Sequence, residues 1–318
     1  MPAILVPTEK WAGKVREVTL GGDSRKKVVV GGETTLPFLH FDGVIPHAPA
    51  IAIDVEDVAP QNWSPVLGAV WGDVMREGLA AWARKAVEAG ADMVALTLRS
   101  ADPDMGNTGP AEAVEAVKKV LAAVDVPLIV YGPGIAAKDN EVLVAVSDAF
   151  AGKRLALGLC EDKNYRTIVA TCMANGHIVI ANSPIDINLA KQLNILITDM
   201  DMPGDRILMD PTTGALGYGL EYTYSVMERL RVAALLGDSM TAMPMILNPG
   251  REGWRFKEAK TRDGVPTQWG DLEGRGIAWE TTTAIAQLQA GADILVMRHP
   301  KAVGLVKRAI ASLMATNY

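Results

Sequence analysis

Short, nearly continuous apolar segments alternate with longer amphipathic segments from about residue 49 to the end of the chain. An apolar segment without polar alternation predicts a strand that is covered on both faces, as in a parallel sheet. The strands expected on this basis are Ile51–Val55, Met93–Leu98, Leu128–Tyr131, Leu155–Leu159, Ile178–Ala181, Ile207–Asp210, Pro244–Leu247 and Ile294–Met297.

The amphipathic segments that follow these strands predict helices, because their apolar positions recur at helical spacing. Eight strand–helix units favour an α/β protein built as a closed (β/α)8 TIM barrel. The expected helices are Val74–Ala89, Ala111–Val124, Asn140–Phe150, Tyr165–Asn175, Ile187–Leu193, Leu220–Leu236, Ala278–Ala290 and Ala302–Met314.

A doubly wound open sheet is the alternative to the barrel. Such a sheet normally carries a glycine fingerprint directly after its first strand, and none follows Asp54. An internal repeat also favours the barrel, because Ala89–Asp92 and Ala290–Asp293 share the sequence Ala-Gly-Ala-Asp. In both copies the glycine ends a helix and the next residues enter a strand.

The N-terminal residues depart from this alternation, and we expect residues 1–48 to form a hairpin and arm that precede the barrel of residues 49–318. Val15–Leu20 and Lys27–Val30 resemble short strands on either side of Gly21–Ser24, a sequence typical of a turn. This extension is expected either to cover the N-terminal mouth of the barrel or to bind a partner.

Composition indicates an ordered cytoplasmic protein, with 49% hydrophobic and 21% charged residues. The formal net charge of −6 disfavours binding to nucleic acid, which needs clustered Lys and Arg. We expect neither a signal peptide nor a membrane helix, because the chain lacks a basic N-terminal start and any apolar run of roughly 20 residues. Cys160 and Cys172 are too few for the four thiolates of an iron–sulfur cluster and fit a reducing compartment.

Side chains at the C-terminal strand ends of such a barrel face the region where ligands bind. The alternative for each is a structural role, since Asp, Ser, Thr and Asn often cap the next helix or bind loop backbone. On strand-end position, the residues expected to contact a ligand are Thr97, Arg99, Tyr131, Asn182, Asp210, Thr212 and Asn248.

Asp54 and Glu56 share one face of the first strand. They are either paired carboxylates for acid–base chemistry or, as we favour, buried charges that pair with Arg99 or Arg298. The chain has no motif of a serine nucleophile, a zinc protease or a Walker loop, and its four histidines are scattered. Asn248–Arg251 is a weak candidate for phosphate binding, because no short extra helix is expected behind it.

The segment Pro249–Ile277 is long for a connection between a strand and a helix, which indicates a functional or partner-contacting role. Its Trp254, Phe256 and Trp269 are either interface anchors or residues that pack the loop onto the barrel. Several sulfur-containing residues are expected mainly to fill the core: Cys160, Met200, Met202, Met209, Met240, Met243 and Met245.

Four segments of the chain resemble the small subunit of the corrinoid/iron–sulfur protein, the delta-type subunit of the acetyl-CoA decarbonylase/synthase complex. The similarity extends over the whole length, and the implied β/α barrel agrees with the strand pattern. The segments are Gly31–Phe38 with the sequence GGETTLPF, His40–Gly43, Pro49–Asp54 and Tyr131–Gly134.

The resemblance implies a subunit that performs no catalysis alone. In this family the large subunit carries the four-iron cluster and holds a cobamide, which the small subunit covers with the top of its barrel. The cobalt carries a methyl group from a methyltetrahydrofolate-dependent methyltransferase to CO dehydrogenase/acetyl-CoA synthase, in the Wood–Ljungdahl pathway of carbon dioxide fixation. The expected cofactor is therefore a corrinoid shared within a heterodimer, with no iron–sulfur cluster in this chain.

Two alternatives stay open at this point. A pterin-binding methyltransferase is also a barrel that serves this cobalt, and Asp54, Asp210 and Asn248 are available to hydrogen-bond a pterin. An aldolase-like barrel needs a Schiff-base lysine late in a strand, whereas Lys163 lies beyond the fourth strand. Co-purification separates these possibilities, because only the subunit is expected together with a larger, coloured, cysteine-rich partner.

Overall fold

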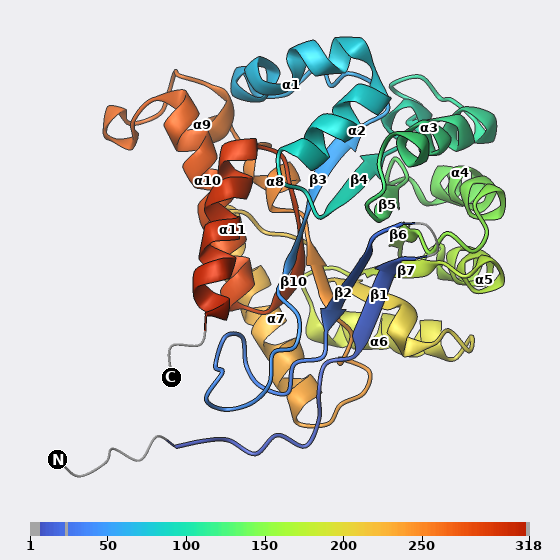
Figure 1. The fold of residues 1–318 in the computed structure, drawn as a ribbon, viewed down its shortest axis with the longest axis vertical. Coiled ribbons are helices and arrows are strands. Elements are labelled where there is room, and N and C mark those ends of the chain that lie inside the picture. Colours follow the sequence, from blue (N-terminus) through green and yellow to red (C-terminus); the bar gives the residue numbers. More distant parts are fainter. Residues whose placement is uncertain (1–6, 23–24, 316–318) are drawn as a thin grey trace.

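The computed structural model describes residues 7–22 and 25–315, and at its centre eight parallel strands close into a barrel (Figure 1). The last strand pairs with the first in parallel, so the predicted TIM barrel is confirmed and the open sheet is wrong. The strands are β3 (Ala50–Glu56), β4 (Met93–Thr97), β5 (Leu128–Tyr131), β6 (Ala156–Cys160), β7 (Ile178–Asn182), β8 (Ile207–Asp210), β9 (Met245–Leu247) and β10 (Ala292–Met297).

Helices follow the strands and form the outer layer of the barrel (Figure 1). Within the described residues, none of them has the length and apolar character needed to cross a membrane. The main helices are α1 (Pro65–Glu77), α2 (Leu79–Glu88), α3 (Pro110–Ala123), α4 (Ala136–Ala149), α5 (Tyr165–Asn175), α6 (Ile187–Thr198), α7 (Leu220–Leu235), α10 (Leu272–Gln289) and α11 (Pro300–Met314).

The first predicted helix, Val74–Ala89, is instead two helices that meet at Gly78. The φ of Gly78 is 108°, outside the helical range and rarely adopted by residues with a side chain. α1 also begins well before the predicted start, because the Ser64 side chain accepts a hydrogen bond from Val66 N–H and Pro65 suits the first helical position.

The predicted loop Pro249–Ile277 is largely helical. It contains α8 (Pro249–Gly253), α9 (Lys257–Lys260) and the 3₁₀ turn η3 (Thr267–Trp269). α10 then begins at Leu272, earlier than expected, because the Asp271 carboxylate caps it by accepting from Gly274 N–H at 2.8 Å. The expectation of no short helix after the seventh barrel strand was wrong, since α8 occupies that place.

The N-terminal hairpin packs against the interior of the barrel. Its strands β1 (Glu17–Gly21) and β2 (Lys27–Gly31) pair antiparallel, while the turn residues 23–24 lie outside the described residues. The side chains that the hairpin adds to the hydrophobic interior of the barrel are Val18, Leu20 and Val30.

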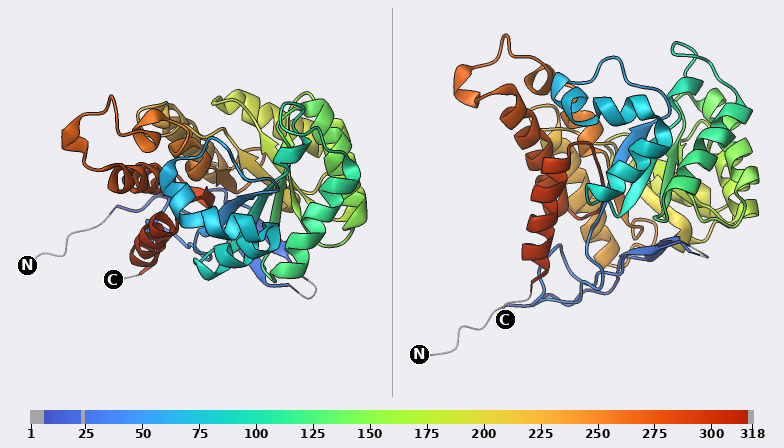
Figure 2. Two further views of the ribbon diagram at one scale, coloured as in Figure 1. Left: turned by 90° about the horizontal axis from the view of Figure 1, so that it is seen from above. Right: turned by 45° about the horizontal axis from the view of Figure 1, so that its top comes forward.

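Backbone hydrogen bonds place this hairpin at the N-terminal strand ends. Arg16 N–H donates to Ala242 O at 2.7 Å, and Lys26 N–H donates to Asp125 O at 2.9 Å. Ala242 and Asp125 shortly precede β9 and β5. The hairpin therefore covers the N-terminal mouth, as one of the two interpretations predicted, on the side opposite the projecting segment around α9 (Figure 2).

Candidate functional site

Most of the predicted contact residues lie together at the C-terminal end of the barrel, away from the hairpin. Arg99 lies at the margin of this group: it starts the 3₁₀ turn η1 (Arg99–Ala101), and its guanidinium lies 3.4 Å from Asp102 on the same loop while its charge also acts on Glu56. The strand ends that meet here carry Thr97 (β4), Tyr131 (β5), Asn182 (β7), Asp210 and Thr212 (β8) and Asn248 (β9).

Asp54 and Glu56 at the end of β3 are both paired with one arginine side chain. Arg298 Nη2 lies 2.6 Å from Asp54 Oδ2 and 3.1 Å from Glu56 Oε1, and Thr97 Oγ1 donates to Asp54 Oδ1 at 3.1 Å. Burial raises the pKa of Glu56, and the Arg298 charge opposes that rise. The favoured ion-pair interpretation is thus confirmed for Arg298, not for Arg99.

Arg251 is a central residue of this end, although its sequence context predicted only a weak phosphate site. Its Nη2 donates to Thr97 Oγ1 at 2.7 Å and lies 3.7 Å from Asp54. Its guanidinium carbon also lies 5.4 Å from the centre of the Tyr131 ring, a cation–π contact. α8 turns the chain directly after β9 and thereby carries Arg251 toward β4 and β5.

Asp210 organises the opposite part of the barrel mouth. One carboxylate oxygen accepts from Thr212 N–H at 2.9 Å, and the other accepts from Asn248 Nδ2 at 3.3 Å. Burial raises the pKa of Asp210 to about 6. Thr212 has a φ of 63°, which is uncommon for a β-branched residue, and its hydroxyl donates to Ser183 O at 2.6 Å. Such strained residues are concentrated at functional sites.

Buried polar atoms without a hydrogen bond of normal geometry are found at this end of the barrel. They are the Tyr131 hydroxyl, the Ser183 hydroxyl and Asn248 Oδ1. Tyr131 and Asn248 still interact with each other, whereas the Ser183 hydroxyl belongs to a residue that lines a cavity. An unsatisfied buried polar group costs about 1–3 kcal/mol, so each such group in a folded protein needs an explanation. Their position at the strand ends indicates that this surface is completed by polar groups of a bound molecule or by water.

A cavity of about 530 Å³ opens beside these groups, within the size range of ligand-binding pockets. Its polar wall comes from the loops that follow β6, β7 and β8. Its apolar wall comes from α6, whose Leu189 side chain is 44% exposed. The polar wall includes Asp162, Lys163, Asn182, Ser183 and Thr212, and the apolar wall includes Leu189, Leu193 and Leu196.

The aromatic residues of the segment after β9 do not act alike. Trp254 is buried and its indole N–H donates to Glu280 at 2.6 Å, whereas Phe256 stacks on Tyr218 at 3.4 Å between ring centres. These two pack the segment onto its own barrel. Trp269 packs on Trp279 of α10, with 5.7 Å between ring centres, and is still 49% exposed.

Exposed apolar side chains surround the C-terminal end of the barrel. Each lies in a loop after a strand or in the first turn of the next helix, and we call this set the apolar rim. Exposed apolar side chains near one another are typical of interaction surfaces. The apolar rim consists of Met105, Ile135, Leu189, Tyr218, Tyr222 and Trp269.

The sulfur-containing residues serve the core, as predicted. Cys160 and Cys172 are buried and free, and burial raises the pKa of the Cys172 thiol to about 12, so it is unreactive near neutral pH. Of the methionines predicted to fill the core, Met202, Met209, Met243 and Met245 are buried, whereas Met200 and Met240 are only partly buried.

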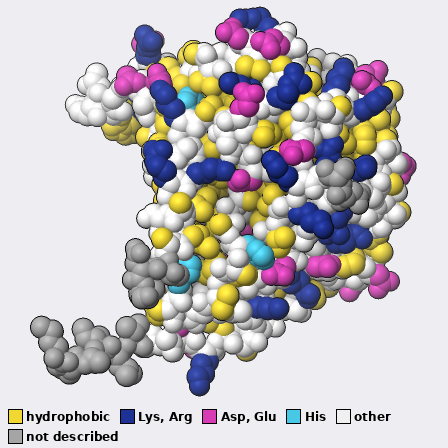
Figure 3. All heavy atoms as spheres, in the orientation of Figure 1, with side chains coloured by type: hydrophobic (Ala, Val, Ile, Leu, Met, Phe, Trp, Pro, Cys, Tyr) yellow, Lys and Arg dark blue, Asp and Glu magenta, His cyan; other side chains and the backbone are white. Residues whose placement is uncertain are grey.

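Charged and apolar side chains are interspersed on the hairpin face of the molecule. Basic side chains are distributed over the face shown in Figure 3 together with acidic and apolar ones. Across residues 7–22 and 25–315, no group of three or more His, Cys, Asp or Glu is arranged to hold a metal ion.

The chain matches one protein family over most of its length. The sequence model described as CO dehydrogenase/acetyl-CoA synthase delta subunit matches residues 17–306. The delta subunit of the acetyl-CoA decarbonylase/synthase complex from Archaeoglobus fulgidus is 39% identical, over 96% of this chain and 70% of the relative. The delta 1 subunit from Methanosarcina thermophila is 37% identical, over 96% of this chain and 72% of the relative.

Solved structures resemble the chain in fold alone. Dihydropteroate synthase from Coxiella burnetii, in complex with pteroic acid, superposes with a TM-score of 0.59 at 12% identity, over 94% of this chain and all of that one. The enzyme from Xanthomonas albilineans with 4-aminobenzoic acid gives a TM-score of 0.56 at 16% identity, over 86% of this chain and 96% of that one.

Proposed function

We propose, because this chain belongs to the family of CO dehydrogenase/acetyl-CoA synthase delta subunits, that it is the small subunit of a cytoplasmic corrinoid/iron–sulfur protein. Its partners are the large subunit that holds the cobamide and the cluster, a methyltetrahydrofolate methyltransferase, and CO dehydrogenase/acetyl-CoA synthase. The corrinoid, when bound, supplies a cobalt that carries a methyl group. This chain supplies the surface that covers it and catalyses nothing alone.

The observation that carries this proposal is the cavity at the barrel mouth, which combines a polar wall with an apolar one. The polar wall includes Asn182, Thr212 and the Ser183 hydroxyl, which has no hydrogen-bond partner within the chain. A corrinoid has a broad apolar ring with amide groups at its edge, so it offers hydrogen bonds to the polar wall and a face for apolar contact with the other. The residues present therefore fit the group.

The two ends of the barrel have different roles in this proposal. We assign residues 1–48 to an arm, whose described residues cover the N-terminal end, and residues 49–318 to the barrel that would meet the cofactor. Asn182, Thr212 and Asn248 would hydrogen-bond the edge of the corrinoid, while the leucines of α6 would contact its apolar part and exclude water. Thr97, Tyr131 and Asp210 would fix the base of this surface, and Arg99 would act at its edge.

The observed geometry gives less support to a pterin-dependent methyltransferase. Both oxygens of Asp54 already accept hydrogen bonds, from Arg298 and from Thr97. Both oxygens of Asp210 are likewise engaged by groups of this chain. A pterin would therefore have to share these carboxylates with the partners that they already have within the chain.

The proposal is tested by coexpressing the chain with its large subunit and purifying the coloured complex. Leu189→Glu places a charge on the apolar wall of the cavity, so we expect the affinity between the subunits to fall about tenfold. The reduced cobalt should then be oxidised faster by air, because the corrinoid is less well covered.

A second exposed apolar residue of α6 provides a matched control. Ile195 is 37% exposed and does not line the cavity, so Ile195→Glu should leave both the affinity and the oxidation rate unchanged. Wild-type behaviour of Leu189→Glu, or equal damage by both variants, would count against the proposed surface. An unchanged oxidation rate after removal of the small subunit would rule out shielding.

A further inference from the structure

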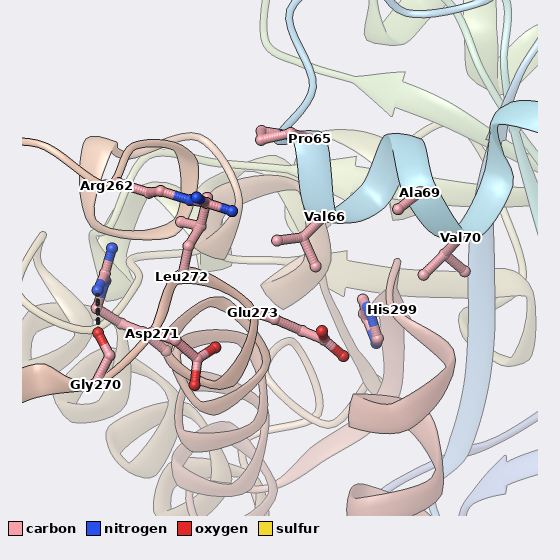
Figure 4. Close-up of a pocket in the computed structure, with 11 residues that line it drawn as sticks. Pro65, Val66, Ala69, Val70, Arg262, Gly270, Asp271, Leu272, Glu273 and His299 are labelled. Atoms are coloured by element: carbon pink, nitrogen blue, oxygen red, sulfur yellow. Dashed lines mark hydrogen bonds between the residues drawn. The ribbon is translucent and has the colours of Figure 1, made fainter.

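A second cavity, of about 690 Å³, lies between α1 and the start of α10 (Figure 4). Its apolar wall is formed by the first turns of α1, including Val66, Ala69 and Val70. The facing wall is the start of α10, with the side chains of Asp271 and Glu273. This groove shares no lining residue with the cavity beside α6, so it is a separate site.

His299 lines the groove with a polar atom that has no partner. The side chain is only 1% exposed, and its ring stacks on Trp254 with 5.7 Å between ring centres. Nε2 is buried without a hydrogen bond. In Figure 4 the ring lies between Val70 and Glu273, at the end of the groove away from Pro65. An unsatisfied buried group beside a cavity of this size indicates that a ligand completes it.

The backbone of α11 determines whether the missing partner of His299 is a hydrogen-bond donor or an acceptor. Lys301 N–H donates to His299 Nδ1 at 3.1 Å, so Nδ1 is an acceptor and the proton of the neutral ring is on Nε2. Burial lowers the pKa of His299 to about 4, which keeps the ring neutral in the cell. Nε2–H is therefore a permanent donor, and its missing partner is an acceptor such as a carbonyl oxygen.

The charges around the groove favour a neutral ligand. Asp271 caps α10, Glu273 pairs with Lys301, and the guanidinium of Arg275 donates to three backbone carbonyls. With Arg262 the wall carries two acidic and two basic side chains, so no surplus charge attracts an ion. A ligand with a free carboxylate would lose hydration on entering the groove, and it would lie beside the acidic Glu273.

We propose that this groove binds a neutral amide, whose carbonyl oxygen accepts a hydrogen bond from His299 Nε2–H and whose apolar part lies against Val66, Ala69 and Val70. The inference does not depend on the corrinoid surface. The amide belongs either to a small molecule or to the backbone of another polypeptide, and the two sources are separable by experiment.

The test is a titration of the full chain, labelled with ¹⁵N at its histidine rings, which number four. The probes are N-acetyl-leucine methylamide, which is neutral, and N-acetyl-leucine, which has the same body and a carboxylate. We expect the methylamide to shift the His299 Nε2–H signal in a saturable manner and the carboxylate to bind roughly tenfold more weakly. A capped tripeptide that binds more tightly than the single residue would identify a polypeptide source, and equal binding would identify a small molecule.

Two variants separate binding from folding. His299→Asn keeps an oxygen that can cap α11 but removes the Nε2 donor, so methylamide affinity, measured by calorimetry for this variant and wild type, should fall roughly tenfold. Ala69→Trp fills the groove from an exposed position and should abolish binding, whereas Ala311→Trp, exposed elsewhere on α11, should leave binding unchanged. Binding to the Ala69→Trp variant is followed at the same histidine signal.

Three results would overturn the proposal. The first is a His299 signal that neither probe moves, and the second is a carboxylate that binds as tightly as the methylamide. The third is a His299 Nε2–H signal that is strongly downfield without a probe and returns to normal in Glu273→Ala. This last result would mean that Glu273 already satisfies the donor within the chain.

Discussion

Arg298 is the residue that allows two carboxylates to share the end of β3. Its guanidinium contacts both Asp54 and Glu56, and all three side chains are less than one tenth exposed. A buried ion pair contributes little compared with apolar packing, but removing one member leaves a buried charge without compensation. Here two carboxylates would be left facing each other, with Arg251 and Arg99 the remaining bases that act on them.

We therefore expect Arg298→Met to lower the free energy of unfolding by about 3–5 kcal/mol at pH 7. The loss should be smaller at pH 5, because burial raises the pKa of Glu56 and protonation then removes one of the two charges. Urea denaturation at both pH values measures this. Arg76→Met, which breaks an exposed pair with Asp73, is the control and should change stability by roughly 0.5 kcal/mol or less. A loss independent of pH would show that packing, not charge, explains the effect.

At the scale of elements, strands were easier to predict than helix starts. A buried strand such as β4 or β10 can be recognised from a short run of mostly apolar residues. The start of α10 depends on a single capping contact from Asp271, and the break between α1 and α2 depends on the φ of Gly78. The periodic pattern of apolar residues shows neither a capping contact nor the φ of a glycine. The prediction therefore missed most of α1.

The candidate site was predictable where closure of the barrel alone brings residues together. Tyr131 and Asp210 end their strands, and a closed ring of parallel strands necessarily places them at one mouth. Arg251 was not predictable as a central residue, because its place depends on α8. Glu280 was also missed, since its partners are distant in sequence and no local motif marks it.

Glu280 joins three elements, and its protonation should therefore affect stability. From α10 it accepts hydrogen bonds from Trp254 Nε1 and from the backbone N–H groups of Arg298 and His299, at the turn between β10 and α11. Burial raises its pKa from 4.5 to about 7. The folded state thus binds the proton more tightly than the unfolded state. The stabilisation of the folded state by proton binding at Glu280 is complete below about pH 4.5 and is lost as the pH rises through 7.

We expect wild type to lose roughly 1–3 kcal/mol relative to Glu280→Gln between pH 5 and pH 8, because the glutamine does not titrate. Unfolding in urea at intervals of one pH unit gives this difference directly. Glu115→Gln at an exposed site should show no such trend. A constant difference between wild type and Glu280→Gln would mean that Glu280 has the same pKa in both states.

At the scale of the whole molecule, the two ends of the barrel have different surfaces. The hairpin fills the N-terminal mouth, and the buried cluster of Arg231, Glu33 and Asp293 fastens the segment that follows it. The C-terminal end instead carries the polar side chains of the strand ends, the cavity beside α6 and the apolar rim. A partner that covers a cofactor should therefore bind at the C-terminal end.

This asymmetry predicts which surface variants weaken the complex with the large subunit. Met105 and Ile135 of the apolar rim are 40% and 43% exposed, so burying both should contribute about 1 kcal/mol each. The double variant Met105→Ser/Ile135→Ser should then raise the Kd of the complex at least tenfold, measured by calorimetry with purified subunits. Val44 and Leu236 are 61% and 67% exposed but lie away from the C-terminal mouth, so Val44→Ser/Leu236→Ser should leave the Kd unchanged. If Val44→Ser/Leu236→Ser instead raised the Kd more than Met105→Ser/Ile135→Ser, the partner would bind at the hairpin end of the barrel. It could not then form hydrogen bonds with the polar groups at the C-terminal end.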